Sequence, residues 1–595
     1  MSFEPTLKLR DFSGGLNTKM RPNKIAANQM KSILSMDFVA NSMQRAKGYT
    51  KLGTEADDTL TGKTLYTHTI LAGQDVLIKT IGTYLKFYDS VDDAWYKLTD
   101  STFTTDLRWS FATFNSYLYG VNGIDNWIFW KGSTLTTIVN AITAISTTID
   151  LAVGKGALYP ASGTVMIQNE EIAYTGKAAD QLTGCTITAS HGAGSAVCLK
   201  VDSTTYSGLT KAKQIAFFKN RMYAVDYATP TFLRHSVLAD NTTPETDLLN
   251  FTVGGGAGDA GYGIAPDELV SIKALTVGSQ SSVLMALGKD GVAYHFQVID
   301  GSATTTNAFV PMRIMNSYPV AKQMVEVVEN DIMFIDQFGH ARTLNYGDVN
   351  TPLNVQTISQ FIEPSLEAMD FSDGAIKSYK RKVYIAGKTS TAASNDLVFY
   401  HDANYNAWGA YSHWDAVDFS VYNDVLYALS AISGDVWKLE QDYNANDGQY
   451  YSEMITGDLD WGYPLFYKKI LKLRMSGYIT SNCDAYIDLY FDNSTTPITY
   501  LINGDNTNII GGRPNVAVGS VVFGSGVFGG GLPGGVSRRD FVAELMLNDL
   551  IPFLKVAIKI RIDSQDVDFE ANDMVLWAEL ESTNLWLNSK TLART

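Results

Sequence analysis

The sequence predicts an all-β protein: an irregular β-propeller-like body with an inserted small β-domain, a C-terminal β-sandwich, and an N-terminal extended arm with a short helix. Three observations predict this fold. The 595 residues are 45% hydrophobic and 12% aromatic, a composition typical of strands. Short apolar alternations ending at Gly, Asp or Asn recur along the chain. A motif of Asn, one or two residues, and then Leu-Tyr or Met-Tyr also recurs, at 115–119, 220–223 and 423–427.

The N-terminal arm, residues 1–52, contains Gly14-Gly15, which predicts a sharp turn. A short amphipathic helix is expected over 25–36, starting near Pro22 or Asn23. Residues 1–50 hold eight basic and three acidic residues, whereas the whole chain has a net charge of −16. A basic arm on an acidic body indicates docking on a neighbouring acidic surface. The alternative is that these charges solvate an exposed arm.

The propeller is expected in two parts, 53–140 and 202–445, because strand pairs begin near 76, 111, 214, 282, 330, 381 and 419. A large irregular β-sandwich assembly is the alternative. The widest gap, between 111 and 214, is explained by an inserted small β-domain at 141–201. Setting this insert aside leaves an interval of ordinary blade length.

A C-terminal β-domain is expected over 446–595, since half-buried strands alternate there. It contains a Gly-rich loop at 511–535, interpreted as a flexible excursion. A further helix is expected over 357–369, broken by Pro364. The Asx-rich run 442–453 resembles a calcium loop, but its glycine is misplaced and an inter-domain linker is the preferred interpretation.

Chemistry-bearing patterns are weak in this sequence. Its seven histidines and three cysteines show no metal-ligand spacing, so neither metal nor cofactor is predicted, and Cys185 and Cys198 remain a possible pair. The Gly-x-Gly-x-x-Gly match at 256–261 is interpreted as a loop, since Pro266 follows it. The acidic charge disfavours a protein that grips DNA. No signal peptide and no transmembrane run are expected. The sequence therefore predicts a protein that is not an enzyme.

Two motifs resemble bacteriophage tail proteins. The run Phe12-Ser-Gly-Gly-Leu-Asn-Thr18, followed by Arg45-Ala-Lys-Gly-Tyr49, resembles the opening of one such family. The run 168–176 resembles small Gly-x-Glu-x-Ile-x-Tyr-Thr-Gly domains inserted in phage tail proteins, except that Gln168 replaces the first glycine. The chain most resembles the nozzle, or tail-tube hub, of short-tailed phages.

The resemblance implies a structural virion protein of the tail, assembled in the bacterial host cytoplasm. Its copies form a ring, expected to be a homohexamer, around the DNA-ejection channel below the portal and adaptor. Tail fibre or needle proteins are further partners, DNA passes without sequence-specific binding, and no membrane anchor is expected. The alternatives are a receptor- or glycan-binding minor tail protein and, less favoured, a propeller glycosidase.

Two sets of residues are the candidates for these roles. Deleting residues 1–50 is expected to leave folded monomers that fail to join tails. The assembly arm comprises Phe12, Gly14, Gly15, Leu16, Asn17, Arg21, Arg45, Lys47 and Tyr49, and the candidate channel or gate loop comprises Phe523, Phe528, Gly529, Gly530 and Gly531.

Overall fold

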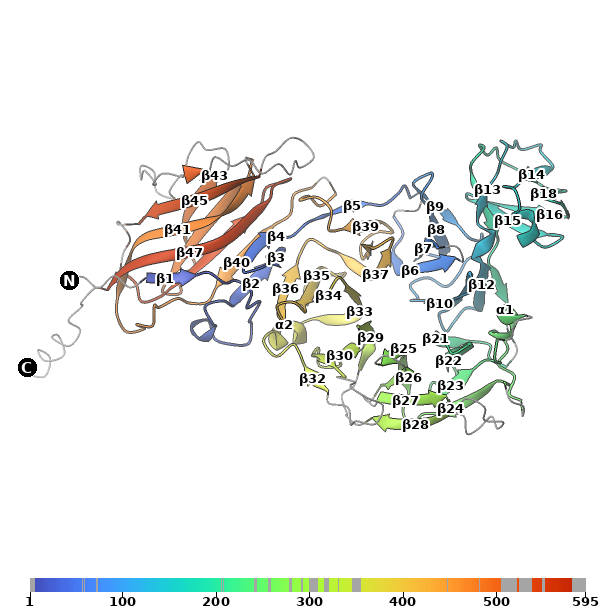
Figure 1. Cartoon of the computed structure of the whole chain (residues 1–595), viewed down its shortest axis with the longest axis horizontal. Coiled ribbons are helices and arrows are strands. Elements are labelled where there is room, and N and C mark those ends of the chain that lie inside the picture. The colour runs from blue at the N-terminus through green and yellow to red at the C-terminus, as the bar shows by residue number, and fades with distance from the viewer. Residues whose placement is uncertain are drawn as a thin grey trace, which may run out of the picture.

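The computed structural model is a nearly all-β molecule (Figure 1). It describes residues 6–580, except 56, 58, 71–72, 205, 207, 240–242, 255–257, 278–280, 290–292, 299–308, 315–319, 330, 345–354, 447, 481, 504–521, 524–537, 548–549 and 551.

Seven four-stranded antiparallel sheets, counted over the described residues, surround a central axis as the blades of a β-propeller (Figure 1). The first strands of neighbouring blades contact one another around the axis. From the inner to the outer strand, the blades are β6 (Gly62–Ile70), β7 (Gln74–Ile81), β8 (Tyr84–Asp89), β9 (Ala94–Lys97); β10 (Ser110–Phe114), β11 (Tyr117–Val121), β12 (Trp127–Lys131), β20 (Asp202–Thr204); β21 (Ala212–Phe218), β22 (Arg221–Asp226), β23 (Phe232–His235), β24 (Gly261–Ile264); β25 (Leu269–Val277), β26 (Ser281–Gly288), β27 (Ala293–Val298), β28 (Phe309–Ile314); β29 (Val320–Val328), β30 (Asp331–Asp336), β31 (Ala341–Thr343), β32 (Gln356–Thr357); β33 (Asp370–Tyr379), β34 (Lys382–Lys388), β35 (Leu397–Asp402), β36 (Ala407–Tyr411); and β37 (Ala416–Tyr422), β38 (Val425–Ser430), β39 (Val436–Leu439), β5 (Tyr49–Lys51).

The recurring Asn motif marks the turn between the first two strands of a blade. Asn115 and Ser116 join β10 to β11, and both have positive φ, 45° and 69°. Asn423 opens the corresponding turn of the last blade, and Asn220 is the second residue of the corresponding turn of the third blade, after Lys219. Two successive positive φ values define the tight hairpin turn in which Asn is favoured. The Asn motif therefore marks one type of hairpin turn, which recurs in these three blades.

The ring is closed by the N-terminal segment. Strand β5 is the outermost strand of the last blade, where Tyr49 pairs with Leu439 and Lys51 with Trp437. The chain then enters β6 of the first blade. The last part of the predicted arm is thus a blade strand.

The insert lies between the third and fourth strands of the second blade and projects from the propeller (Figure 1). Its two small sheets enclose a core of their own, which includes Ile149, Val165 and Ile172. Its elements are β13 (Thr136–Thr137), β14 (Thr148–Asp150), η3 (Gly156–Leu158), β15 (Gly163–Ile167), β16 (Glu170–Tyr174), β17 (Gly176–Ala178), β18 (Gln181–Thr183) and β19 (Ala196–Leu199), preceded by η2 (Gly132–Thr134).

The sandwich is built from both ends of the chain (Figure 1). One sheet contains β3 (Met36–Val39), β4 (Ser42–Arg45), β47 (Phe569–Leu580), β41 (Lys468–Thr480), β45 (Arg538–Met546) and β44 (Val522–Phe523), with β1 (Thr6–Leu9) paired to β47. The other contains β2 (Met30–Leu34), β40 (Ser452–Thr456), β46 (Val556–Ile562), β42 (Asp484–Phe491) and β43 (Ile498–Asn503).

The helix predicted over 25–36 is wrong. A 3-10 turn, η1 (Pro22–Lys24), is followed by strand β2. Met30 and Ile33 are both buried although they are three residues apart, because the register of β2 shifts between Met30 and Ser32. An irregularity of this kind moves the inward face by one residue and imitates helical spacing.

Two short α-helices occur in the described residues. They are α1 (Pro244–Asp247) and α2 (Glu363–Glu367). Pro364 lies in the first turn of α2, where its missing N–H costs nothing, so it starts this helix instead of breaking one. Among the described residues, no helix is long and apolar enough to cross a membrane.

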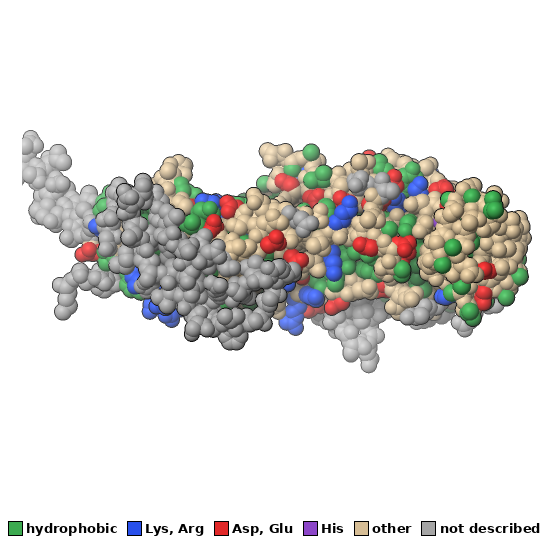
Figure 2. All heavy atoms as spheres, turned by 90° about the horizontal axis from the view of Figure 1, so that it is seen from above, with side chains coloured by type: hydrophobic (Ala, Val, Ile, Leu, Met, Phe, Trp, Pro, Cys, Tyr) green, Lys and Arg blue, Asp and Glu red, His purple; other side chains and the backbone are tan. Residues whose placement is uncertain are grey.

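Seen from above, the molecule is elongated and flat, with the insert at one end (Figure 2). Acidic and basic side chains are interspersed on this face and do not form one large patch of a single sign.

Candidate functional site

The axial channel of the propeller is a polar cavity of about 480 Å³. Inner strands or the residues just before them line it in all seven blades, and each blade contributes at least one polar or charged residue. These side chains are Tyr66, Arg108, Gln214, Ser271, Lys273, Glu326, Lys377 and Asp418.

The channel charges are arranged in contact with one another. Lys377 Nζ lies 3.0 Å from Glu326 Oε1, and Lys273 Nζ lies 3.6 Å from Glu326 Oε2. Burial opposes the charge on Lys377, but the neighbouring Glu326 carboxylate outweighs it and raises the pKa of Lys377. The ammonium groups of Lys273 and Lys377 thus share the carboxylate of Glu326.

Asp418 is a second acidic group of the channel. Burial raises the pKa of Asp418, although Arg108 and the Leu65 N–H favour its charged form.

One mouth of the channel is shaped by irregular strand starts. In six blades the register of the first strand shifts near its first residues, as between Gly62 and Thr64 or Ala212 and Gln214. A cavity of about 340 Å³ lies there, lined by Lys63, Lys213 and others. Arg108 borders both cavities, so the mouth and the channel are adjacent.

The predicted assembly arm forms a joint between the sandwich and the propeller. Leu16 N–H donates to Trp408 O at 2.7 Å, and Asn17 N–H donates to Met30 O at 2.8 Å. Gly15 has a φ of 76°, and a Cβ there would lie 2.8 Å from Trp408 N. Gly14 is packed as closely against Asn28, and Phe12 is fully buried. These residues hold their own chain together.

Arg45 is the buried cation of this joint, only 1% exposed. Its guanidinium donates to Val567 O at 3.0 Å, Tyr450 O at 2.9 Å and Ser452 Oγ at 3.3 Å. The Tyr450 ring lies 4.1 Å below it. This arginine, which sequence reasoning placed on an arm for docking, satisfies backbone carbonyls inside the molecule.

His413 lies at the same joint, stacked on the Tyr450 ring with 4.2 Å between centroids. Its Nδ1 is 2.7 Å from Ser35 Oγ, and its Nε2 is 3.2 Å from the carbonyl of Lys47. Burial lowers the pKa of His413 to about 3. The Tyr49 ring is stacked on the His413 ring and lies tilted, at 43°, beside the Trp437 ring.

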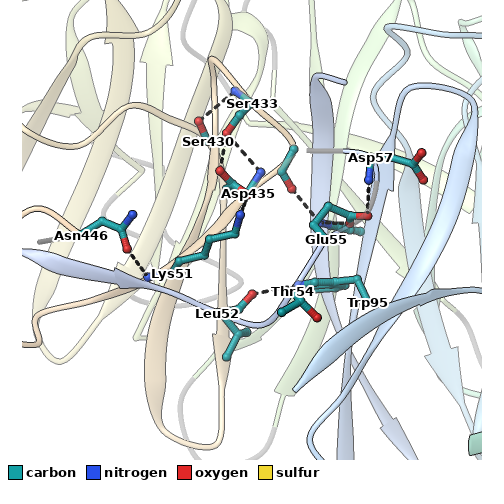
Figure 3. Close-up of polar contacts among 12 residues, drawn as sticks. Lys51, Leu52, Thr54, Glu55, Asp57, Trp95, Ser430, Ser433, Asp435 and Asn446 are labelled. Atoms are coloured by element: carbon teal, nitrogen blue, oxygen red, sulfur yellow. Dashed lines mark hydrogen bonds and ion pairs between the residues drawn. The ribbon is translucent and has the colours of Figure 1, made fainter. Parts of the chain in front are cut away.

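The propeller closure is tied by ion pairs (Figure 3). Lys51 of β5 lies 2.7 Å from Asp435 of the last blade. A few residues on, Glu55 contacts the buried ammonium groups of Lys79 and Lys86 in the first blade. Burial lowers the pKa of Lys79 to about 8 despite this partner. The strand and its linker are therefore fixed at both ends.

The remaining predicted residues fall in different places. Arg21 is exposed, and Phe523 is in β44 at the edge of the sandwich. Phe528, Gly529, Gly530 and Gly531 lie outside the described residues. Cys185, Cys198 and Cys483 are free and buried. No group of His, Cys, Asp and Glu within the described part of the chain has metal-binding geometry.

The run 442–453 links the propeller to the sandwich. Asn444 O accepts from Tyr49 N–H, and Asn446 Oδ1 accepts from Lys51 N–H. The Asx side chains and carbonyls of this linker therefore support the closing strand.

A groove of about 790 Å³ lies between the insert and the second blade. Tyr117 and Phe129 line it with nearly parallel rings, 12° apart with centroids at 5.1 Å, and Lys131, Asp202 and Glu245 add charge. Sequence reasoning missed both the channel and the groove, because each collects side chains far apart in the chain. The Asn turn motif follows the first strand of a blade, so the residues that line the channel could be located by counting back from it.

Comparison with protein-family models and with curated proteins finds no match. Among solved structures, YCF48 from Cyanidioschyzon merolae has a TM-score of 0.33 and 9% identity over 66% of this chain and 98% of its own. The β-propeller domain of Myceliophteria thermophila Cps50 (Swd1) has a TM-score of 0.34 and 9% identity over 67% and 99%. A computationally designed protein, Ika8, has a TM-score of 0.32 and 9% identity over 66% and 99%. The propeller assignment rests on the strand pairing itself.

Proposed function

We propose that this chain is a structural subunit of a bacteriophage tail, of the nozzle or tail-tube-hub kind, with a mechanical and not a catalytic role. The observation that carries the proposal is the joint. The residues that resemble the phage family, from Phe12 to Asn17 and from Arg45 to Tyr49, fasten the sandwich to the propeller. Because the sandwich and the propeller are fastened to each other, we expect the molecule to transmit force from one to the other without either unfolding first.

In this proposal, six copies form a ring around the DNA path in the virion, below the portal and adaptor. A single propeller does not provide that path, because its axial cavity of about 480 Å³ is of the size of a small-molecule site. The acidic net charge of −16 supports a wall that DNA passes without sticking. The Gly-rich loop 511–535 is proposed as the gate, since glycines adopt many conformations.

The proposal corrects the docking hypothesis. Residues 1–52 were expected to reach a neighbour, but strands β1 to β5 are built into the chain's own sheets. A part of this segment that remains exposed for contact with a neighbour is the loop that contains Lys19 and Arg21. Negative-stain microscopy of the purified protein, and immunogold labelling of virions, test the proposal. We expect rings in the first and label at the tail in the second; protein that stays monomeric at high concentration and is missing from virions would contradict it.

The second candidate function is receptor or glycan binding, which the groove beside the insert favours. Its parallel aromatic pair and its flanking charges are the chemistry that sugars use, through ring stacking and hydrogen bonds. Binding of the isolated protein to intact host cells tests this function. Tyr117→Ala should abolish binding there, while Tyr262→Ala, in a parallel aromatic pair of the third blade, should not.

A further inference from the structure

The axial channel carries an excess of positive charge in an acidic protein. Three basic side chains line it, Arg108, Lys273 and Lys377, against two acidic ones, Glu326 and Asp418. The chain as a whole has a net charge of −16. The channel is therefore a local positive site.

The two lysines are only partly neutralised. Both contact the same carboxylate, Glu326, at 3.0 and 3.6 Å. Their side chains remain 30% and 34% exposed, so each still offers N–H donors to the cavity. An ammonium group has three donors, and one carboxylate shared between two lysines does not use them all.

A buried hydroxyl group, that of Ser271, lines the same cavity as the two lysines. Ser271, two residues before Lys273 on β25, lines the cavity and is 1% exposed. Its Oγ has no hydrogen-bond partner among the described residues. A buried hydroxyl without a partner is costly, so such groups normally meet a ligand or water. Ser271 and Lys273 lie on one face of their strand.

The cavity also has a suitable size and an entrance. Its volume of about 480 Å³ lies in the range of small-molecule sites. The adjoining mouth cavity shares Arg108 with the channel and provides an entrance; Lys63 and Lys213 line it together with Asp106, Glu268 and Asp373, so its charges are balanced.

We propose that the axial channel binds a small oxyanion, a phosphate or a carboxylate, held by Lys273 and Lys377 with the Ser271 hydroxyl as a further donor. Ammonium groups and hydroxyls donate to such oxygens, and the charge assistance makes these hydrogen bonds strong. The proposal concerns the single chain, and it does not depend on ring assembly or on a role in a phage tail.

Isothermal titration calorimetry of the full chain with inorganic phosphate and, separately, with citrate tests the site. Sodium chloride at the same ionic strength is the control. We expect saturable binding of at least one of these oxyanions. Binding of phosphate alone would identify a phosphate site, and binding of citrate alone would identify a carboxylate site. Equal, non-saturating responses to all three salts would show screening only and would overturn the proposal.

Variants make the test specific. Lys377→Met should weaken binding roughly ten- to a hundred-fold, the effect of one charge-assisted hydrogen bond. Lys388→Met is the matched control, because Lys388 is in the same blade, lies 3.0 Å from Asp370 and is 29% exposed, yet does not line the channel. It should leave the affinity unchanged.

Glu326→Gln gives a prediction of opposite sign. It removes the carboxylate that competes for both lysines, so oxyanion binding should tighten, whereas Ser271→Ala should weaken binding. If the lysines and Glu326 form only an internal ion network, Glu326→Gln will lower stability without tightening binding. That result, with circular dichroism showing an intact fold, would overturn the proposal.

Discussion

The insert and the sandwich are both small β-structures, but they are assembled in different ways. The insert forms its sheets and its core from one continuous stretch, so that Ile149 packs with Val165 and Ile172 nearby in sequence. The sandwich takes β1 to β4 from the first 45 residues and its other strands from beyond residue 451. One region is a local unit, and the other exists only when the ends of the chain meet.

This difference has an energetic consequence. Bringing distant segments together costs loop-closure entropy, which buried contacts must offset. The joint does so with Arg45, Phe12 and the glycine pair, all packed closely. We expect damage at the joint to affect the whole molecule, whereas damage in the insert should stay local.

The largest expected effect separates the two regions by deletion. Removing residues 1–52 eliminates the closing blade strand β5 and four sandwich strands, so the protein should aggregate and lose cooperative unfolding. Replacing residues 138–195 by Asn-Gly should leave a folded propeller, because Thr137 and Ala196 are directly paired and a two-residue hairpin turn can join them. Size-exclusion chromatography and thermal unfolding measure both. Soluble monomers after this deletion, which is the outcome that the sequence predicted for deletion of residues 1–50, would contradict the comparison.

The next effect concerns the buried cation of the joint. Arg45→Met leaves the carbonyls of Val567 and Tyr450 without their donor, and should lower the free energy of unfolding by about 3–5 kcal/mol. Arg21→Met, an exposed arginine of the same segment, should change it by less than about 0.5 kcal/mol. Urea denaturation compares them. Equal effects would show that Arg45 is no more than a surface charge.

Glycines sharpen the comparison further. Gly15 and Gly194 both have positive φ, 76° and 91°, but a Cβ at Gly15 would clash with Trp408 and Ala407, while at Gly194 it meets nothing within 4 Å. Gly15→Ala should cost about 2–4 kcal/mol, from backbone strain plus overpacking, and Gly194→Ala about 1–2 kcal/mol, from strain alone. Urea denaturation also measures this difference. A cost at Gly194 equal to that at Gly15 would contradict a close-packed joint.

The smallest effect near neutral pH comes from a titrating group at the joint, His413. Burial lowers the pKa of His413 to about 3 in the folded chain, from the ordinary value of 6.5. Between these two pH values the unfolded chain therefore binds one more proton than the folded chain. The free energy of unfolding should therefore fall as pH drops from about 6.5 towards 3. His413→Gln should flatten this part of the profile relative to wild type. If the variant keeps the same slope of unfolding free energy against pH, His413 is not the group that causes the loss of stability in acid.

Several parts of the fold could be predicted from the sequence because their signals are local. Alternating strands and Asn turns predicted a propeller-like all-β body, and the structure confirms it. The helix over 25–36 could not be excluded in this way, since a register irregularity in β2 gives Met30 and Ile33 a helical spacing. The charged cluster of the channel could not be predicted from the sequence, since Lys273, Glu326 and Lys377 belong to three different blades.

The sequence by itself determined where turns, strands and the insert would form, because backbone preference and side-chain alternation act over a few residues. Only the tertiary structure decided that the Ser-Gly-Gly-Leu-Asn-Thr segment is an internal joint and not a free arm. A count of charges cannot distinguish a cation that meets another molecule from one that, like Arg45, is buried against carbonyls of its own chain. That choice depends on which distant strands pair, and pairing is settled by the burial that the whole fold provides.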